Sequence, residues 1–288
     1  MDYVIKASYG NDSIALIQWM VEQGHTNAFV LHNDTGWARA DWAARVEAGE
    51  AFARSVGMEP VRTQAKSGDG LRALAAKLDA ATRVPIPWRD VAAERSRRAQ
   101  SPSIGFVDVV RLKRAFPRSG MQFCTTMLKI EPSLAWLDEV DPAGDMIAVV
   151  GIRREESAKR SQWPEWTEDS PLDGGRSLWA PLVHMTAAER DALIVRAGFP
   201  VLPHRSKECW PCVHAPRADL RELAKDPERV AVIRDLEAEL SEGKAKPRRM
   251  FRRQGGIDET IAWAQSAPGR YVEGQESMID CDAGWCGG

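Results

Sequence analysis

A polar loop near the N-terminus has the composition of a phosphate-binding turn. An apolar run at residues 2–7 leads into Ser-Tyr-Gly-Asn-Asp-Ser at 8–13, and helical spacing of apolar residues follows at 14–22. Backbone N–H groups at a helix start attract anions, and a glycine lets the chain come close to a phosphate. Ser8 and Ser13 would donate hydrogen bonds, whereas Asp12 would repel a phosphate unless Mg²⁺ lay between them. The loop predicts an anion cradle; the alternative is an ordinary strand–helix turn capped by Ser and Asp.

The spacing of this loop disfavours two common phosphate-binding motifs. The Gly-x-x-x-x-Gly-Lys of a Walker A loop is absent, and so is the Gly-x-Gly-x-x-Gly of a dinucleotide site.

A second charged segment follows the clearest predicted strand, at residues 145–150. It reads Gly151-Ile-Arg-Arg-Glu-Glu-Ser157, and Arg160 lies three residues further on. Arginine pairs in a bidentate way with phosphate or sulfate, so Arg153 and Arg160 are candidates for the anion. We expect Glu155 to orient one of these arginines. The alternative is a solvated turn with local ion pairs.

The five cysteines have the spacing of metal ligands. Cys209-Trp-Pro-Cys212 is a compact pair, Cys281 and Cys286 form a looser pair, and Cys124 stands alone. Two thiolates at Cys-x-x-Cys spacing can face one metal, but spacing alone does not separate zinc from iron–sulfur. One alternative is therefore a zinc site made by the two pairs, with Cys124 buried.

The elements that would position these groups alternate along the chain. We expect strands at 2–7, 28–32, 60–63, 145–150 and 178–182, and helices at 14–22, 42–56, 70–81, 126–139, 186–197, 217–225, 227–242 and 257–265. Alternating strands and helices predict an α/β fold with a parallel sheet and crossover helices. We expect an α/β domain over residues 1–200 and a smaller, mainly helical lobe with the Cys-x-x-Cys pair and the cysteine tail over 201–288.

Four motifs, in order, carry a resemblance to a known family. Ser8-x-Gly-x-Asp-Ser13 resembles the PP-loop of the adenine nucleotide α-hydrolase superfamily. The segments Asp34-Thr-Gly36, Cys124 to Pro132 and Gly151 to Arg160 resemble motifs of its phosphoadenosine phosphosulfate (PAPS) reductase branch. The resemblance covers about residues 4–160 and implies a doubly wound parallel sheet, with the nucleotide at the carboxyl ends of the strands.

The resemblance also implies the parts of the nucleotide site. The phosphates would lie on Ser8, Tyr9, Gly10, Asn11, Asp12 and Ser13, and the ribose or base near Asp34, Thr35 and Gly36. Gly151 and Arg153 would complete the nucleotide site. The implied catalytic groups are Asp12, Lys129, Arg153, Arg160 and Cys281.

The segment around Cys124 resembles the one in which cluster-bearing relatives place a ligand, although Thr125 stands where the family has a second cysteine. The favoured interpretation is a [4Fe–4S] cluster held by Cys124, Cys209, Cys212 and Cys286. Cys281 would then be free to act as a nucleophile or to carry a persulfide. Which of Cys281 and Cys286 is the ligand stays open.

The expected function is that of a PAPS reductase-like enzyme that cleaves ATP, with Mg²⁺, between the α and β phosphates for sulfur transfer or nucleic-acid modification. The alternatives are a genuine PAPS reductase that uses a C-terminal cysteine and a non-catalytic nucleotide-sensing module. The formal net charge of −2 argues against binding of nucleic acid by bulk charge, although the basic tract at 244–253 could contact phosphates. A nucleic acid or a sulfur carrier is the expected partner, and a homodimer the expected assembly. No apolar run is long enough to span a membrane and no signal peptide is visible, so the cytoplasm is the expected location.

Overall fold

The computed structural model describes residues 1–67, 100–118, 120–158, 160–251 and 255–266. The helix predicted at 70–81 lies outside the described residues, and so do Cys281 and Cys286.

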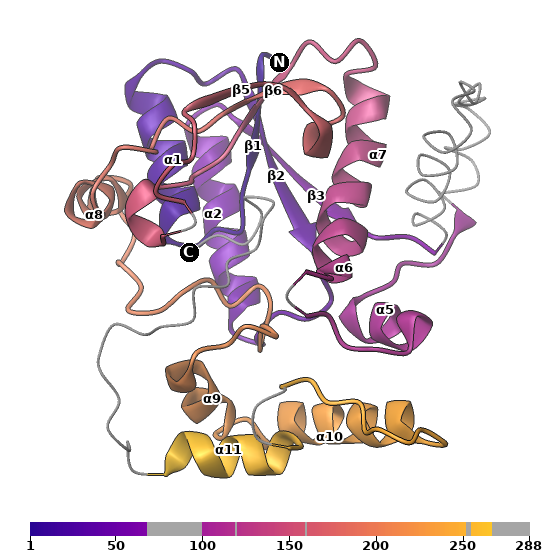
Figure 1. The fold of residues 1–288 in the computed structure, drawn as a ribbon. Coiled ribbons are helices and arrows are strands. Elements are labelled where there is room, and N and C mark those ends of the chain that lie inside the picture. Colours follow the sequence, from indigo (N-terminus) through magenta and orange to yellow (C-terminus); the bar gives the residue numbers. More distant parts are fainter. Residues whose placement is uncertain (68–99, 119, 159, 252–254, 267–288) are drawn as a thin grey trace.

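A six-stranded sheet forms the centre of the molecule (Figure 1). Its strands are β1 (Tyr3–Lys6), β2 (Ala28–Asp34), β3 (Glu59–Gln64), β4 (Ile147–Val149), β5 (Trp166–Ser170) and β6 (Arg176–Trp179), in the order β3-β2-β1-β4-β6-β5. All neighbours are parallel except β5, which pairs antiparallel with β6. The predicted doubly wound α/β fold is confirmed.

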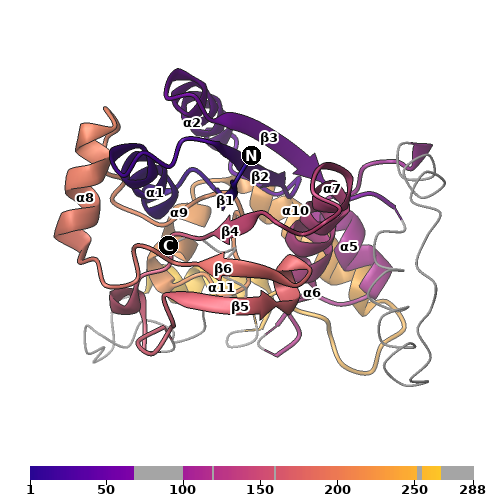
Figure 2. The ribbon, with the colours of Figure 1, turned by 90° about the horizontal axis from the view of Figure 1, so that it is seen from above.

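Successive residues of each central strand face opposite sides of the sheet, and each side has its own helices. Ile5 and Val30 point toward α1 (Asn11–Glu22), α2 (Trp42–Ser55) and α8 (Ala187–Arg196). Val4 and Leu31 point toward α7 (Glu131–Val140) on the other face. Figure 2, seen from above, shows α7 separated by the sheet from α1, α2 and α8. Because both faces are covered, the inner strands are almost continuously apolar.

The helix predicted at 126–139 has an irregular start. The short α6 (Phe123–Thr125) passes into a π-helical segment at Thr126–Ile130, and α7 continues to Val140. Apolar spacing alone did not reveal the wider turn, because one extra residue per turn changes the pattern only locally.

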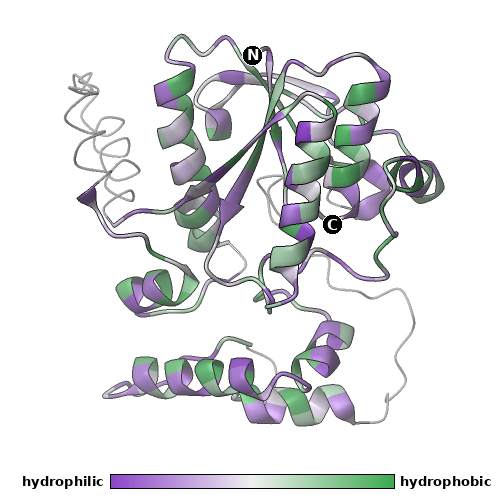
Figure 3. Ribbon diagram, turned by 180° about the vertical axis from the view of Figure 1, so that it is seen from behind, coloured by the Kyte–Doolittle hydropathy of each residue, from purple (hydrophilic) through white to green (hydrophobic). Residues whose placement is uncertain are grey.

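A helical layer lies beyond the carboxyl ends of the strands (Figure 1). It consists of α9 (Arg217–Leu223), α10 (Pro227–Ser241) and α11 (Ile257–Gln265), with α5 (Phe106–Lys113) beside it. Apolar and polar residues alternate along α10 and α11 (Figure 3), as expected of helices buried on one side. Their buried residues share one cluster with Trp37 and Phe106. The boundary between residues 200 and 201 stays a prediction.

Three elements differ from expectation. β5 was not predicted as a strand, and no single helix was predicted over α5. β6 lies at 176–179 rather than at the predicted 178–182. β5 is mostly exposed and polar, so it lacks the apolar run that marks a buried strand. α8 begins with a capping box, in which Thr186 and Glu189 satisfy each other's backbone N–H groups. None of the described helices is long and apolar enough to cross a membrane.

Candidate functional site

The sheet order creates a crevice at the carboxyl ends of β1 and β4. The chain runs from β1 outward to β2 and β3, then returns to place β4 on the other side of β1. Such a switch point is where open α/β sheets bind their ligands. A cavity of about 410 Å³ lies there, lined by Lys6, Ala7, Ser8, Asp12, Ser13, Asn33, Lys129, Gly151, Arg160 and Glu208.

The predicted cradle at residues 8–13 is a buried, hydrogen-bonded turn. The Ser8 N–H donates to Ser13 Oγ at 3.1 Å, and the Gly10 N–H donates to Ser8 Oγ at 3.4 Å. Tyr9 adopts a left-handed backbone (φ 57°), which turns the chain into α1. Its ring fits because residue 49 is glycine: a Cβ there would lie 2.2 Å from the ring.

Only part of the loop lines the cavity with side chains. Ser8, Asp12 and Ser13 do so, whereas the Asn11 amide is bonded to the backbone of Leu202 through both its oxygen (3.0 Å) and its nitrogen (2.9 Å). The side chains of Tyr9 and Asn11 are therefore committed to the fold, and a ligand contact by these residues would come from their backbone.

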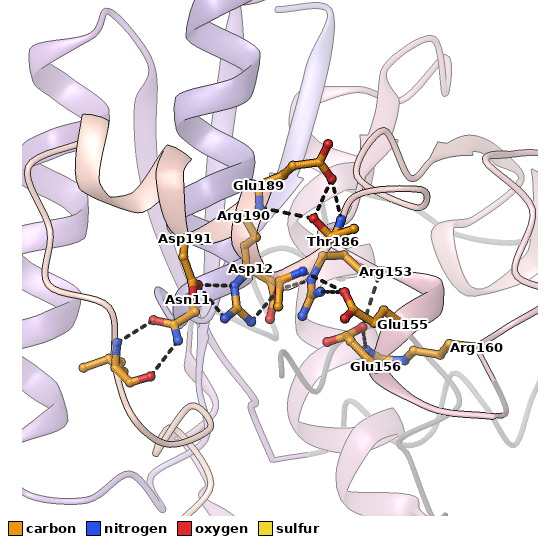
Figure 4. Close-up of polar contacts among 12 residues, drawn as sticks. Asn11, Asp12, Arg153, Glu155, Glu156, Arg160, Thr186, Glu189, Arg190 and Asp191 are labelled. Carbon is orange, nitrogen blue, oxygen red and sulfur yellow. Dashed lines mark hydrogen bonds and ion pairs between the residues drawn. The ribbon is translucent and has the colours of Figure 1, made fainter.

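Asp12 is the centre of a charged network from three elements (Figure 4). Its Oδ1 lies 2.8 Å from Arg153 Nε, after β4, and 3.5 Å from Arg190 on α8. Glu155 accepts from the same Arg153 at 3.3 Å. Asp12 Oδ2 is buried and has no hydrogen-bond partner among the described residues. One oxygen of this carboxylate is thus bound by arginine, whereas the other lacks a hydrogen-bond partner among the described residues.

The segment after β4 is not a solvated turn at the two predicted arginines. Arg153 and Arg160 are each only 4% exposed. Arg160 forms an ion pair with Glu156, and Glu156 also accepts from the Arg153 N–H at 3.1 Å. Burial raises the pKa of Glu156, the nearby charge of Asp12 adds to the effect, and Arg160 opposes it. The arginines are therefore fixed in place before a ligand binds.

Gly151 joins this segment to the cradle. A Cβ at this position would lie 2.9 Å from the backbone oxygen of Asp12. Because that neighbour is backbone, only glycine allows β4 and the start of α1 to approach so closely.

The Asp34-Thr-Gly36 turn is positioned from the neighbouring strand. Asp34 is exposed and its carboxylate accepts from the Gly36 N–H at 2.8 Å, while Thr35 Oγ1 donates to the Glu208 backbone oxygen at 3.0 Å. Gly36 has φ 62°, and a Cβ there would meet the Gly105 Cα at 3.1 Å. Trp37, which follows this turn, is buried against Phe106 with ring centres 4.7 Å apart.

Lys129 lies on the boundary between the first cavity and a second one. It lines both, and its Nζ is 3.2 Å from Glu208 Oε2. Burial alone would lower the pKa of Lys129, but the carboxylate of Glu208 outweighs it and raises that pKa. The ammonium group therefore stays charged at neutral pH. Glu208 Oε1 is buried without a hydrogen-bond partner among the described residues.

The second cavity, of about 470 Å³, brings three predicted metal ligands together. Cys124, Cys209 and Cys212 line it with Thr35, Gln122, Thr125, Leu128, Lys129, Arg205, Val213 and His214. Burial raises the pKa of Cys124 to about 11 and that of Cys209 to about 12, so both are neutral thiols as the protein stands. Within the described ranges, no three Cys, His, Asp or Glu residues are close enough to hold one metal ion.

Four residues of the site were not predicted from the sequence. Lys6 ends β1 and pairs with Asp173, Asn33 lies on β2, and Arg190 and Glu208 come from late in the chain. Their roles depend on which strands and helices become neighbours. Only Glu208 had a local signal, because it precedes Cys209.

Comparison with known proteins assigns the family. The phosphoadenosine phosphosulfate reductase domain matches residues 90–260, which is more than half of the chain. The chain belongs to this family. The matched range includes Cys124, the Gly151–Arg160 segment and the Cys209–Cys212 pair, whereas the cradle at 8–13 precedes it.

Two similar proteins extend the comparison. A protein of Escherichia phage 186, described as an uncharacterized 37.8 kDa protein in the gpa 5' region, is 30% identical over 146 residues. The match covers 46% of this chain and 42% of the phage protein, so the chain spans less than half of that relative. The crystal structure of PAPS reductase from Candida auris, a phosphate complex, matches with a TM-score of 0.39 and 11% identity, covering 69% of this chain and 73% of that one.

Proposed function

We propose that this member of the family binds ATP in the first cavity and cleaves it between the α and β phosphates. The observation that carries the proposal is the meeting of the Ser8–Ser13 turn with Arg160 and Lys129 at one crevice. Such a site offers N–H and O–H donors together with fixed positive charge, the combination that phosphates require.

Asp12 supports ATP with Mg²⁺. Arg153 and Arg190 neutralise one side of the Asp12 carboxylate, and its unpartnered Oδ2 would suit a hard cation beside the phosphates. Asp12 would hold the ion, with Glu208 Oε1 as a second oxygen on the same cavity. Bound there, Mg²⁺ would supply neutralisation of phosphate charge.

The protein's own groups would act mainly by positioning and charge. An acceptor oxygen bonds to the α-phosphorus, the bond from that phosphorus to the bridging oxygen breaks, and pyrophosphate leaves. Arg160 and Lys129 stabilise the negative charge that builds on the phosphate oxygens, while Asp12 and Glu156 hold Arg153 and Arg160 in place. The product is an adenylated acceptor ready for sulfur transfer.

We propose an iron–sulfur cluster rather than a zinc ion because Cys124, which the zinc alternative leaves out, lines the second cavity with Cys209 and Cys212. Cysteine thiolates are the usual ligands of such clusters. Cys124, Cys209 and Cys212 would hold it, with Cys286 as the proposed fourth ligand. Binding of the cluster would deprotonate the thiols of these cysteines and would supply redox chemistry next to Lys129.

A genuine PAPS reductase is the second candidate, and the position of Lys129 favours it. A residue that lines both the anion cavity and the thiol cavity would hold a sulfonate close to cysteine chemistry. Cys281 would then be the proposed nucleophile.

The test is to incubate anaerobically purified protein with ATP and Mg²⁺, or with PAPS and a thiol reductant. Pyrophosphate release from ATP is the expected result, and sulfite release from PAPS would support the second candidate instead. Thermal stabilisation by either nucleotide without turnover would indicate a sensor. Iron and sulfide analysis of the same sample tests the cluster; one zinc and no iron would overturn it.

A further inference from the structure

Exposed basic side chains gather around α5 and the loop that follows α10. They come from residues 111–118 and 244–248, and they are Arg111, Lys113, Arg114, Arg118, Lys244, Lys246 and Arg248, named here the α5–α10 basic surface. The chain as a whole has a formal net charge of −2, so this concentration of positive charge is local.

Two contacts bring the halves of this surface together. Arg111 Nε lies 3.0 Å from Glu239 Oε2 near the end of α10. Half a turn later, Ser241 Oγ accepts from the Arg248 N–H at 2.8 Å, which folds the loop back on the helix. Figures 1 and 3 show α5 and this loop at the same end of α10 from opposite sides.

The loop is held firmly by a buried carboxylate. Glu237 is 2% exposed and accepts from the backbone N–H groups of Met250 and Ile257, both at 2.9 Å. Met250 and Phe251 are buried in the cluster of the helical layer. The loop therefore presents its basic residues from a fixed backbone.

Most of these charges have no internal partner. Lys113, Arg114, Lys244, Lys246 and Arg248 form no ion pair or side-chain hydrogen bond with the residues that the structure describes. Two nearby acids already have partners: Asp108 caps the start of α5, and Glu239 pairs with Arg111. Like charges repel one another, so a surface of this kind is satisfied by an external polyanion.

One end of the surface is close in sequence to the lining of the thiol cavity. The segment that contains Arg118 and Met121 continues directly into Gln122 and Cys124, which line that cavity beside Arg205. Leu112 and Met121 are 67% and 45% exposed and lie among the basic residues. Apolar contact area between cations suits bases and sugars between phosphates better than a simple anion.

We propose that the α5–α10 basic surface binds the phosphodiester backbone of a nucleic-acid strand and directs it toward the thiol cavity. Unpaired cations on two adjacent segments match a ligand with regularly spaced negative charge. The inference goes beyond the proposed nucleotide chemistry and does not depend on it, because binding is measured without ATP.

The test compares the full chain with the triple variant Lys113→Gln, Lys244→Gln, Lys246→Gln. Fluorescence anisotropy is recorded with single-stranded RNA, single-stranded DNA and duplex DNA of one sequence over a salt series. We expect the variant to lose at least about tenfold in affinity and about two units of the slope of log K against log salt, since each lost phosphate contact removes roughly 0.7 to 0.9. The nucleic acid whose affinity differs most between the full chain and the triple variant is the type that the surface binds.

A matched control removes the same charge elsewhere. Arg54→Gln, Arg196→Gln, Lys225→Gln alters exposed residues after or within α2, α8 and α9 and should change affinity less than threefold. Equal losses in the two triple variants would overturn the proposal, because bulk charge would then explain binding. Binding to anionic phospholipid vesicles with none to RNA or DNA would overturn it as well. All three substituted side chains are exposed, so unchanged thermal unfolding is expected and is checked first.

Discussion

Two buried arginine–aspartate pairs lie at opposite ends of β4. At its carboxyl end Asp12 pairs with Arg153, and at its amino end Asp141 pairs with Arg176 at 2.6 Å. Both pairs are nearly inaccessible to solvent. They differ in how fully the protein itself satisfies the carboxylate.

The Asp141 carboxylate is saturated by the protein. Its oxygens accept from the N–H groups of Asp145 (3.0 Å) and Met146 (3.2 Å) as well as from Arg176. Asp12 instead has one buried oxygen without a hydrogen-bond partner among the described residues, and the residue is among those that line the first cavity. A buried polar atom left unpaired costs stability, and a bound ligand that supplies a partner removes that cost. On the function proposed above, the Asp141–Arg176 pair stabilises the sheet, whereas the Asp12–Arg153 pair would serve the bound nucleotide.

The largest expected effect comes from Arg153→Ala. It leaves Asp12 with Arg190 at 3.5 Å as its nearest cation and adds uncompensated negative charge to the anion cavity. Because the uncompensated charge of Asp12 would repel the phosphates, we expect roughly a hundredfold weaker ATP binding, about 3 kcal/mol, measured by calorimetry. Arg154→Ala is the matched control, because that side chain donates to the Trp163 carbonyl, and it should change affinity less than threefold. Equal losses in both variants would remove the distinction between the two arginines.

Asp141→Asn tests the other pair and should act on stability. Because Arg176 loses its charged partner, the substitution is expected to lower the free energy of unfolding by about 1 to 2 kcal/mol at neutral pH. ATP affinity should stay unchanged. Urea unfolding measures the difference, and Asp145→Asn, at an exposed neighbour, is the control.

The effect of Asp141 should depend on pH in one direction. Burial alone would raise the pKa of Asp141, but the bonds from Arg176 and from two N–H groups outweigh it and lower that pKa. A lowered pKa in the folded state means that the carboxylate stabilises the protein above the ordinary value of about 3.9. The gap between wild type and Asp141→Asn should therefore be full at neutral pH and shrink as the pH falls below about 4. A gap that grows on acidification would contradict the assignment.

Asp12→Asn should lower the effect of Mg²⁺ on ATP binding while changing the stability of the fold little. Without ligand, we expect unfolding free energy to change by less than about 1 kcal/mol, because the amide oxygen can still accept from Arg153. The increase in ATP affinity that Mg²⁺ brings should fall by about tenfold, since the amide lacks the charge that favours the ion. ATP titrations with and without Mg²⁺ give the measurement. An unaltered Mg²⁺ dependence would exclude Asp12 as the ion's ligand.

Glu155→Gln should have the smallest effect. Its side chain is 54% exposed and touches Arg153 at 3.3 Å, where solvent weakens the ion pair. We expect less than a threefold loss of ATP affinity. A tenfold loss would mean that Arg153 depends on Glu155 rather than on Asp12.

The sequence predicted the parts of this comparison that depend on local pattern. The strand predicted at 28–32 is observed as β2 over 28–34, and the helix predicted at 257–265 as α11, both from apolar spacing. The anion cradle at 8–13 stays a prediction. The pairing of Asp12 with Arg153 and Arg190 was not predictable in that way. It needs β4 beside β1 and α8 against α1, and these neighbours are set by packing of residues far apart in the chain. Lys6 and Glu208 were missed for the same reason.

The π-helical segment at Thr126–Ile130 has a consequence for where Cys124 points. One extra residue in a helix rotates the residues before it by about 100° relative to the residues after it. Leu134 and Leu137 can therefore lie flat on the sheet while Cys124, more than two turns earlier, faces a different direction and reaches the thiol cavity. Deleting a single residue from this segment would give a regular helix and swing the sulfur about a quarter of a circle away from Cys209 and Cys212.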